Sequence, residues 1–403
     1  MNINFKRDTD SGFLLLGNQP VILHCHHYNV TLQETILMPD YIDGFGIQYK
    51  AAAETAWEAL SGLENTGSPE QVFSAAKELY RIMGLGTLDF EAVDENGGKI
   101  KFPTSHYKIG YAEKVGQVSE TTFVFSAGYL SGVFAFAYKK TYNVTIKREA
   151  GIFLASVEKA SDNLPDFKTV DYNTGRIKNL SEENLGHEGN TNVNTDAVGA
   201  FFRDNPPQAG EDGLIKAFGV YLTYLPANYY NKISYRFEKI LDDAGGIEGL
   251  AKPLLVEAGH ICGFSTFGGI MTSETWKENV GPALKTKEDW VYAMVSAINT
   301  FGWGYWQILE VDPGKKLRVK VLNSVEGIGF HSEFGEASET KCFMAEGTAS
   351  AVMNLIYLGG LESNPVFDDD FYYTLFSSKD SFVAEETLCA AKGDDYCEIT
   401  VAV

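Results

Sequence analysis

The C-terminal stretch of the chain carries a carboxylate and two cysteines at a spacing that suits a metal ion. Glu386 precedes Cys389 by three residues, and Cys397 follows after seven intervening residues. Residues 392–395 (Lys-Gly-Asp-Asp) are a turn signal, because glycine and aspartate accept the backbone conformations of a tight reversal. A turn flanked by two cysteines is typical of a small zinc site. Cys342, at the start of an apolar segment, could supply a fourth ligand and close a structural Zn²⁺ site.

These cysteines also have simpler explanations. Any two of them could be buried core residues, because a free cysteine packs as a small hydrophobic side chain. Cys389 and Cys397 could instead form a disulfide bond. A reducing compartment would favour the metal over the disulfide. The chain has five cysteines in all: Cys25, Cys262, Cys342, Cys389 and Cys397.

A second group of potential ligands lies near the N-terminus, in residues 22–28 (Ile-Leu-His-Cys-His-His-Tyr). Imidazole and thiolate suit zinc, iron or copper. On a strand His24 and His26 would share one face, whereas on a helix His24, His27 and Tyr28 would cluster. One interpretation is a transition-metal or acid–base site, with these four residues as catalytic candidates. The other is a packed segment in which the histidines bond to their neighbours.

The run Cys-Phe-Met-Ala-Glu-Gly-Thr-Ala-Ser at residues 342–350, followed by Glu-x2-Cys-x7-Cys, resembles the C-terminal half of a 4-vinyl reductase (hydrocarbon-binding) domain. The resemblance implies a zinc site formed by Cys342, Glu386, Cys389 and Cys397 beside a pocket for an apolar or aromatic ligand. The segment between Cys342 and Glu386 is longer than the family pattern and includes the acidic, aromatic residues 367–373. Glu385 is an adjacent carboxylate that could replace Glu386 as the ligand.

The chain also contains an internal repeat. Residues 116–131 align without gaps on residues 335–350, with Gly, Ser-Glu-Thr, a later Gly and a final Ser in the same places. We therefore predict two copies of one domain, at residues 1–175 and 213–403. Residues 176–212 are rich in Asn, Gly, Glu and Pro and are predicted to be a linker or excursion, with a short apolar patch that could dock on a domain.

The repeat also predicts that the first copy holds no zinc. Phe123 aligns with Cys342, and Glu149 aligns with Glu386 if the longer segment of the second copy is allowed for. The positions that correspond to the last two cysteines are Ile152 and Ala160. Apolar side chains cannot bind zinc, so any zinc site belongs to the second copy.

The order of elements predicts an α+β fold, with an antiparallel sheet packed against helices in each domain. Ser68, followed by proline, is a helix start signal, and glycines 84 and 86 end that helix. A strand around His106 is also expected. The expected helices are residues 48–60, 68–83 and 121–137 in the first copy and 286–301 and 341–358 in the second. The expected strands are residues 87–93, 99–102 and 141–147, then 304–311 and 317–322.

Composition limits the possible partners. The formal charge of −21 and the scattered basic residues argue against nucleic acid or an anionic membrane surface. The 26 Phe, 21 Tyr and 5 Trp residues suit an apolar ligand pocket as well as a core. We see no signal peptide and expect no apolar run of membrane-spanning length, so we expect a cytoplasmic protein.

Two functions are consistent with these patterns. The first is a small-molecule-binding protein, a sensor or carrier, that encloses an apolar or aromatic ligand and carries a structural zinc site. It could act as a homodimer or through a protein partner. The second is a metal-dependent enzyme that acts on a hydrophobic or tetrapyrrole-like substrate through the cluster from His24 to Tyr28.

Overall fold

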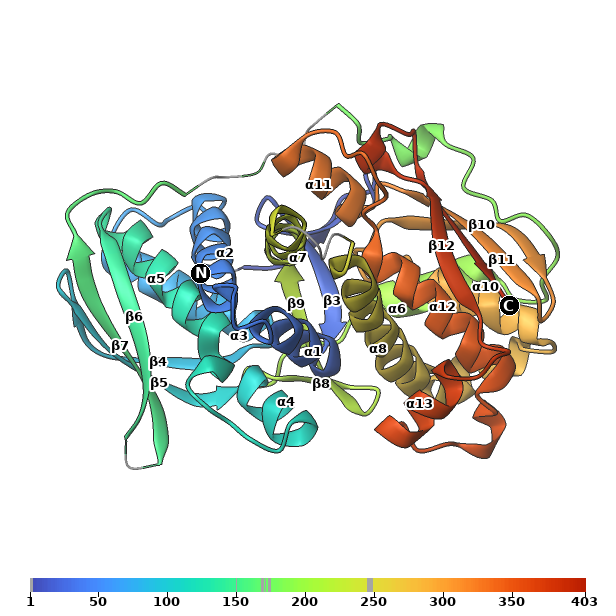
Figure 1. Ribbon diagram of the computed structural model, residues 1–403, viewed down its shortest axis with the longest axis horizontal. Coiled ribbons are helices and arrows are strands. Elements are labelled where there is room, and N and C mark those ends of the chain that lie inside the picture. The colour runs from blue at the N-terminus through green and yellow to red at the C-terminus, as the bar shows by residue number, and fades with distance from the viewer. Residues whose placement is uncertain (1–2, 150, 168–169, 171, 173–174, 245–248) are drawn as a thin grey trace.

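The computed structural model describes residues 3–149, 151–167, 170, 172, 175–244 and 249–403 (Figure 1). Within them the chain forms three antiparallel sheets packed against helices, which confirms the predicted α+β class. Two four-stranded sheets lie at opposite ends of the long axis, and a five-stranded sheet lies between them (Figure 1).

The first half of the chain builds one end of the molecule. Its sheet has the strand order β4-β5-β7-β6, and helix α5 crosses it (Figure 1). The capping box predicted from Ser68 is present, since the Ser68 side chain accepts a bond from Gln71 N and Gln71 bonds back. The helices are α1 (His26–Leu37), α2 (Gly44–Ser61), α3 (Pro69–Ile82), α4 (His106–Lys114), the 3₁₀ turn Thr121–Phe123 and α5 (Val124–Tyr138). The strands are β4 (Gly86–Asp94), β5 (Gly97–Ser105), β6 (Thr141–Glu149) and β7 (Ile152–Ser161).

The second half repeats this order at the other end, with the sheet β10-β11-β13-β12 under helix α12. Its helices are α7 (Ala227–Asp243), α8 (Ala251–Thr272), α9 (Glu274–Asn279), α10 (Lys287–Ile298), α11 (Val325–Phe334), α12 (Phe343–Leu358) and α13 (Asp369–Phe376). Short 3₁₀ turns lie at Gly281–Ala283, Leu361–Ser363 and Ala390–Lys392. The strands are β10 (Tyr305–Asp312), β11 (Lys316–Leu322), β12 (Val383–Leu388) and β13 (Cys397–Ala402).

The long segment between Cys342 and Glu386 contains helix α13. The Asp368 side chain accepts a hydrogen bond from Phe371 N at 2.9 Å and caps this helix. The acidic residues of this segment therefore begin a helix, where a carboxylate is favoured by the unpaired N–H groups and the helix dipole.

The central sheet joins the two halves. Its strands are β1 (Phe5–Arg7), β2 (Leu14–Leu16), β3 (Gln19–Cys25), β9 (Val220–Pro226) and β8 (Ile215–Ala217). Strand β3 of the first half pairs antiparallel with β9 of the second, so that Leu23 lies opposite Tyr224. Helices α1 and α7 follow these two strands directly.

A buried ionic network also connects the halves. Lys232 on α7 is fully buried and contacts Glu54 at 3.0 Å and Glu58 at 2.8 Å, both on α2. Arg236, one turn further along α7, contacts Glu54 at 2.7 Å and Glu333 at 2.8 Å. Buried charges are stable only when they are paired, so this network fixes how α2 lies on α7.

Two helical segments correct the expectation that no apolar run reaches membrane-spanning length. Thr121–Tyr138 and Ala251–Thr272 are long and apolar enough by length and composition. They are 78% and 67% buried inside the molecule, because α5 packs on α2 and α8 packs on α12. Glycines permit this close packing: a Cβ at Gly128 would collide with the carbonyl of Tyr49, and one at Gly347 with the carbonyl of Val256.

Three local expectations from the sequence were wrong or incomplete. The residues around His106 form helix α4 rather than a strand, because the Ser105 side chain caps the helix by accepting a bond from Lys108 N. Strand β7 was not expected. In the predicted linker 176–212 the apolar patch does pack on a domain, but as a helix that was not expected: α6 (Thr195–Asp204) lies on α10, with Val198 and Phe202 buried.

Candidate metal centre

Four residues from three elements of the second half converge under the N-terminus of α12. Cys342 is the residue before that helix, Glu386 lies on β12, Cys389 follows β12, and Cys397 begins β13. Their ligand atoms all lie within 4.8 Å of one another, and all four residues are buried. The structure thus brings together the four residues that the resemblance implied, and this cluster could hold a metal ion.

Backbone groups fix the ligand side chains. Cys342 N donates to Glu386 Oε2 at 2.8 Å, and Ala390 N donates to Cys397 Sγ at 3.2 Å. The Sγ atoms of Cys342 and Cys397 are 3.4 Å apart. The turn between the cysteines is closed by Cys389 N, which donates to Asp394 Oδ2 at 2.8 Å. The site is therefore preorganised by its own backbone.

The donor set fits a closed four-coordinate ion. Glu386 Oε1 is buried and has no hydrogen-bond partner among the described residues. A buried carboxylate oxygen without a partner is costly, and a cation bound there would satisfy it. For a tetrahedral ion with thiolates at ~2.3 Å, neighbouring sulfurs lie ~3.8 Å apart, close to the spacing of Cys342 and Cys397.

The proton balance of the site points in the same direction. Burial raises the pKa of the Cys342 thiol and the pKa of the Glu386 carboxyl. Hydrogen bonds from Cys342 and Cys397 lower the pKa of Cys389, because a Cys389 thiolate would accept hydrogen bonds from both neighbouring thiols. Deprotonating all four ligands would place several buried anions side by side, and a divalent cation would remove their repulsion.

The structure distinguishes between the alternatives that the sequence left open for the ligand carboxylate and for the cysteines. Glu385 is exposed, because neighbouring residues of a strand face opposite sides, and so it lies away from the cluster. Cys389 and Cys397 are free thiols, as are the other three cysteines. Cys25 and Cys262 lie elsewhere, where His24 Nδ1 is 3.3 Å from Cys262 Sγ.

Residues of α11 complete the surroundings of the cluster and were not identified from the sequence. Ser324 Oγ lies 3.2 Å from Cys342 Sγ. Glu326 accepts bonds from Met344 N at 2.9 Å and Ala345 N at 3.0 Å, and burial raises its pKa to about 8. It satisfies the unpaired N–H groups at the start of α12. A cap from another helix leaves no local spacing signal.

The corresponding place in the first half is filled by apolar side chains. Equivalent hydrogen bonds show which residues of the two halves correspond. Ser131 Oγ donates to Tyr142 O in the first half and Ser350 Oγ donates to Phe382 O in the second, so Tyr142 corresponds to Phe382. Four residues further along each strand, Ile146 rather than Glu149 matches Glu386. On the neighbouring strands, Ile399 pairs with Glu386 and Ala155 pairs with Ile146, so Ile399 corresponds to Ala155. Two residues earlier on each of these strands, Cys397 therefore corresponds to Phe153 rather than to Ala160.

Aromatic packing replaces the metal ligands there. The rings of Phe123, which matches Cys342, and Phe153 have centroids 4.8 Å apart. Glu149, the one carboxylate that the sequence alignment retained, is exposed at the end of β6.

The histidines near the N-terminus do not form a comparable group. Among the described residues only the cluster of Cys342, Glu386, Cys389 and Cys397 brings three or more potential ligands together. His24, the last but one residue of β3, stacks on Tyr28 with ring centroids 4.3 Å apart. His26 begins α1, where Nδ1 accepts a bond from Tyr221 N at 3.1 Å and Nε2 contacts Glu113 at 3.1 Å. Burial lowers the pKa of His26 to about 4 and that of His27 to about 3, so both are neutral at pH 7.

Comparison with known proteins gives little further guidance. No family model matches the chain, and no curated protein matches it. Among solved structures, the chain is similar to the phenol-responsive sensory domain of the transcription activator PoxR, crystallised with phenol. That similarity has a TM-score of 0.37 and 15% sequence identity, and it covers 52% of this chain and 90% of the sensory domain.

Proposed function

We propose that this chain is a small-molecule-binding protein, a sensor or carrier for an apolar or aromatic ligand, with a structural Zn²⁺ site in its second half. The metal part of the proposal is supported by one observation above all: three thiols and one carboxylate, all buried, lie within 4.8 Å of one another. The ligand part is supported by the resemblance to hydrocarbon-binding domains and by a large cavity, described below.

Zinc is the ion that this donor set favours. Sulfur-rich sites select zinc or iron–sulfur clusters over the hard cations Mg²⁺ and Ca²⁺. Three protein ligands leave a position for water in catalytic zinc sites, whereas four close the coordination sphere. Cys342, Glu386, Cys389 and Cys397 supply four, so the ion would have a structural role. It would cross-link the start of α12, the end of β12 and the start of β13.

The enzyme alternative lacks a comparable observation. Within the described residues no histidine belongs to a group of three or more potential metal ligands. His24 packs against Tyr28 and Cys262, whereas His26 bonds to Tyr221 and Glu113. These neighbours are an aromatic ring, a thiol, a backbone N–H group and a carboxylate, and they do not form a shared set of metal ligands.

Paired variants test the metal site. Glu386→Gln and Cys389→Ser should each lose zinc and lower the melting temperature, because each leaves the ion with three ligands. Glu385→Gln changes the neighbouring exposed carboxylate and should retain zinc. Cys262→Ser removes a buried thiol outside the cluster and should also retain zinc. Elemental analysis of the purified proteins is the readout. Full zinc content in both Glu386→Gln and Cys389→Ser would contradict the proposal.

A further inference from the structure

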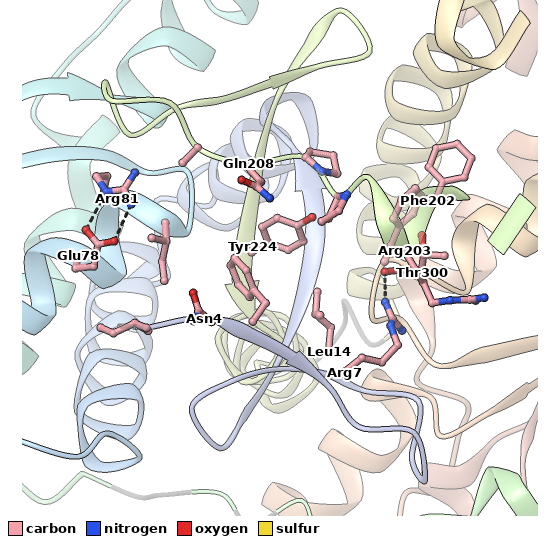
Figure 2. A pocket seen from close by; sticks show the side chains of 17 residues that line it. Asn4, Arg7, Leu14, Glu78, Arg81, Phe202, Arg203, Gln208, Tyr224 and Thr300 are labelled. Carbon is pink, nitrogen blue, oxygen red and sulfur yellow. Dashed lines mark hydrogen bonds and ion pairs between the residues drawn. The ribbon is translucent and has the colours of Figure 1, made fainter. Parts of the chain in front are cut away.

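A cavity of about 660 Å³ lies at the junction of the two halves, on the central sheet (Figure 2). The first half contributes strand β1 and the end of α3, and the second half contributes β9 and the residues that follow α10. The segment after α6 covers a further side with Pro206, Pro207 and Gln208. Its volume is in the range of small-molecule sites, ~300–1,000 Å³.

The lining is aromatic in its interior. Phe5 and Tyr224 pack with ring centroids 4.5 Å apart, and Phe202 and Phe301 pack at 6.2 Å. Burial raises the pKa of Tyr224, so its hydroxyl remains a neutral donor at physiological pH. Rings of this kind offer flat apolar contact to another ring.

The lining is also positive, although the chain carries a formal charge of −21. Arg7, Arg81 and Arg203 line the cavity against one glutamate, Glu78, which gives a net lining charge of +2. Glu78 is fully engaged by Arg81, with contacts of 2.6 and 2.8 Å. Figure 2 shows this pair at one side of the cavity and Arg7 at the other, near Thr300 and Arg203.

Arg7 lacks a counter-ion among the described residues and donates only to backbone carbonyls. Its guanidinium donates to the carbonyl oxygens of Gly12 at 3.1 Å, Asn299 at 3.3 Å and Thr300 at 2.5 Å. Nη1 makes two of these bonds and Nη2 makes one, so on the edge formed by Nε and Nη2 the Nε–H group has no acceptor among the described residues. That edge of a guanidinium binds a carboxylate through two parallel hydrogen bonds.

The electrostatic surroundings of Arg7 support an anionic partner. No carboxylate lies within ion-pair distance of Arg7 or Arg203 among the described residues. Burial and the nearby positive charge of Arg203 both lower the pKa of Arg7. Two neighbouring cations, one of them partly buried, are unfavourable until an anion binds between or beside them.

We propose that this cavity binds a small aromatic carboxylate, with the carboxylate on Arg7 and the ring system against Phe5 and Tyr224. The proposal rests on the small-molecule-binding function proposed above, and it names the site and the ligand class. Both halves contribute to the site, so a bound ligand would bridge them. It is separate from the metal centre, none of whose four residues lines the cavity.

The test compares 2-naphthoate with its neutral isostere 2-naphthamide, by titration calorimetry on the full-length, zinc-containing protein. We expect 2-naphthoate to bind at least tenfold more tightly than the amide, and acetate to bind too weakly to compete. Arg7→Gln should remove this preference, and Arg7→Lys should restore part of it, because lysine keeps the charge and loses the paired hydrogen bonds.

Two further variants keep the test decisive. Arg203→Gln should weaken 2-naphthoate binding severalfold. Because the Arg203 side chain is exposed, this variant should fold and can replace Arg7→Gln if that variant does not fold. Arg148→Gln removes one exposed arginine from β6, far from the cavity in sequence, and should leave binding unchanged. Equal affinities for both naphthalene probes, or equal binding by wild type and Arg203→Gln, would overturn the anionic site.

The outcomes also separate this proposal from the proposed function. Binding of 2-naphthamide as tight as that of 2-naphthoate would overturn the anionic site and leave an aromatic-binding protein. Binding of neither probe by zinc-loaded protein would overturn the cavity as a ligand site and leave the metal centre intact. Absence of zinc with selective 2-naphthoate binding would support the cavity and contradict the metal centre.

Discussion

The buried ionic network between α2 and α7 gives a prediction whose size follows from the structure. Lys232 has no exposed side-chain surface, and its two partners, Glu54 and Glu58, are each 1% exposed. Lys232→Met keeps a similar apolar length but removes the charge. Glu54 then keeps Arg236 as an ion-pair partner, whereas the buried Glu58 loses the cation that it contacts. Removing one partner of a buried ion pair costs ~3–5 kcal/mol, and we expect a loss of this size in the free energy of unfolding at pH 7.5.

The same carboxylate provides a matched control. Lys50 contacts Glu54 at 4.0 Å, but its side chain is 62% exposed. Lys50→Met should therefore cost less than ~1 kcal/mol, as is typical of a solvated pair one helical turn apart. Urea unfolding followed by tryptophan fluorescence measures both variants under the same conditions.

The loss should also depend on pH in a defined direction. Burial raises the pKa of Glu58, and Lys232 opposes that rise. Without Lys232 the pKa of Glu58 rises further. A carboxyl with a raised pKa in the folded state favours folding most at low pH and loses this contribution as pH rises through the folded pKa. The destabilisation of Lys232→Met should therefore be smaller at pH 5 than at pH 7.5. Equal costs for Lys232→Met and Lys50→Met, or a larger cost at pH 5, would refute the reasoning.

Two more predictions concern other buried positions. Burial lowers the pKa of His26 to about 4 from ~6.5 in the unfolded chain, so its contribution to stability is present above pH ~6.5 and is lost as pH falls towards 4. Urea midpoints at pH 7.5 and 5 should therefore differ less in His26→Gln than in wild type, and an unchanged difference would contradict this. Gly347→Ala should destabilise the chain by ~1–3 kcal/mol, because the new Cβ collides with the backbone of α8. Gly281→Ala, whose Cβ has only an ordinary contact, should change the unfolding midpoint little, and equal midpoints for the two alanine variants would count against the packing argument.

Local signals in the sequence predicted some of the helices and strands. The Ser68 cap with proline behind it predicts a helix to residue 83, and the structure has α3 at Pro69–Ile82 with that capping box. Residues 392–395 predict a turn between Cys389 and Cys397, and the structure has this turn between β12 and β13. The helix cap and the turn could be predicted because each depends only on residues that are close together in the sequence.

The features that the sequence did not predict depend on contacts between distant residues. The pairing of β3 with β9 joins Leu23 to Tyr224 across the whole first half, and no local pattern specifies it. The correspondence of Ile146 with Glu386 could be recognised only from the hydrogen bonds of Ser131 and Ser350. The second half has a longer segment before this strand, and the register of the strand is then set by packing rather than by sequence spacing.

The cavity at the junction was also not visible in the sequence. Arg7, Arg81 and Arg203 are far apart along the chain and lie in unrelated segments. Strand β7 is a different case, because Phe153, Ala155 and Val157 alternate with more exposed residues and gave a signal that the sequence interpretation missed.

The most direct test of the metal centre is the mass of the purified wild-type chain under native conditions, compared with its mass after denaturation in acid. The account predicts a native excess of one Zn²⁺ ion per chain, lost together with the fold of the second half when a chelator is added. A protein that folds with the same stability and shows no bound metal, even after incubation with zinc, would contradict the account and leave the four buried residues as an ordinary part of the core.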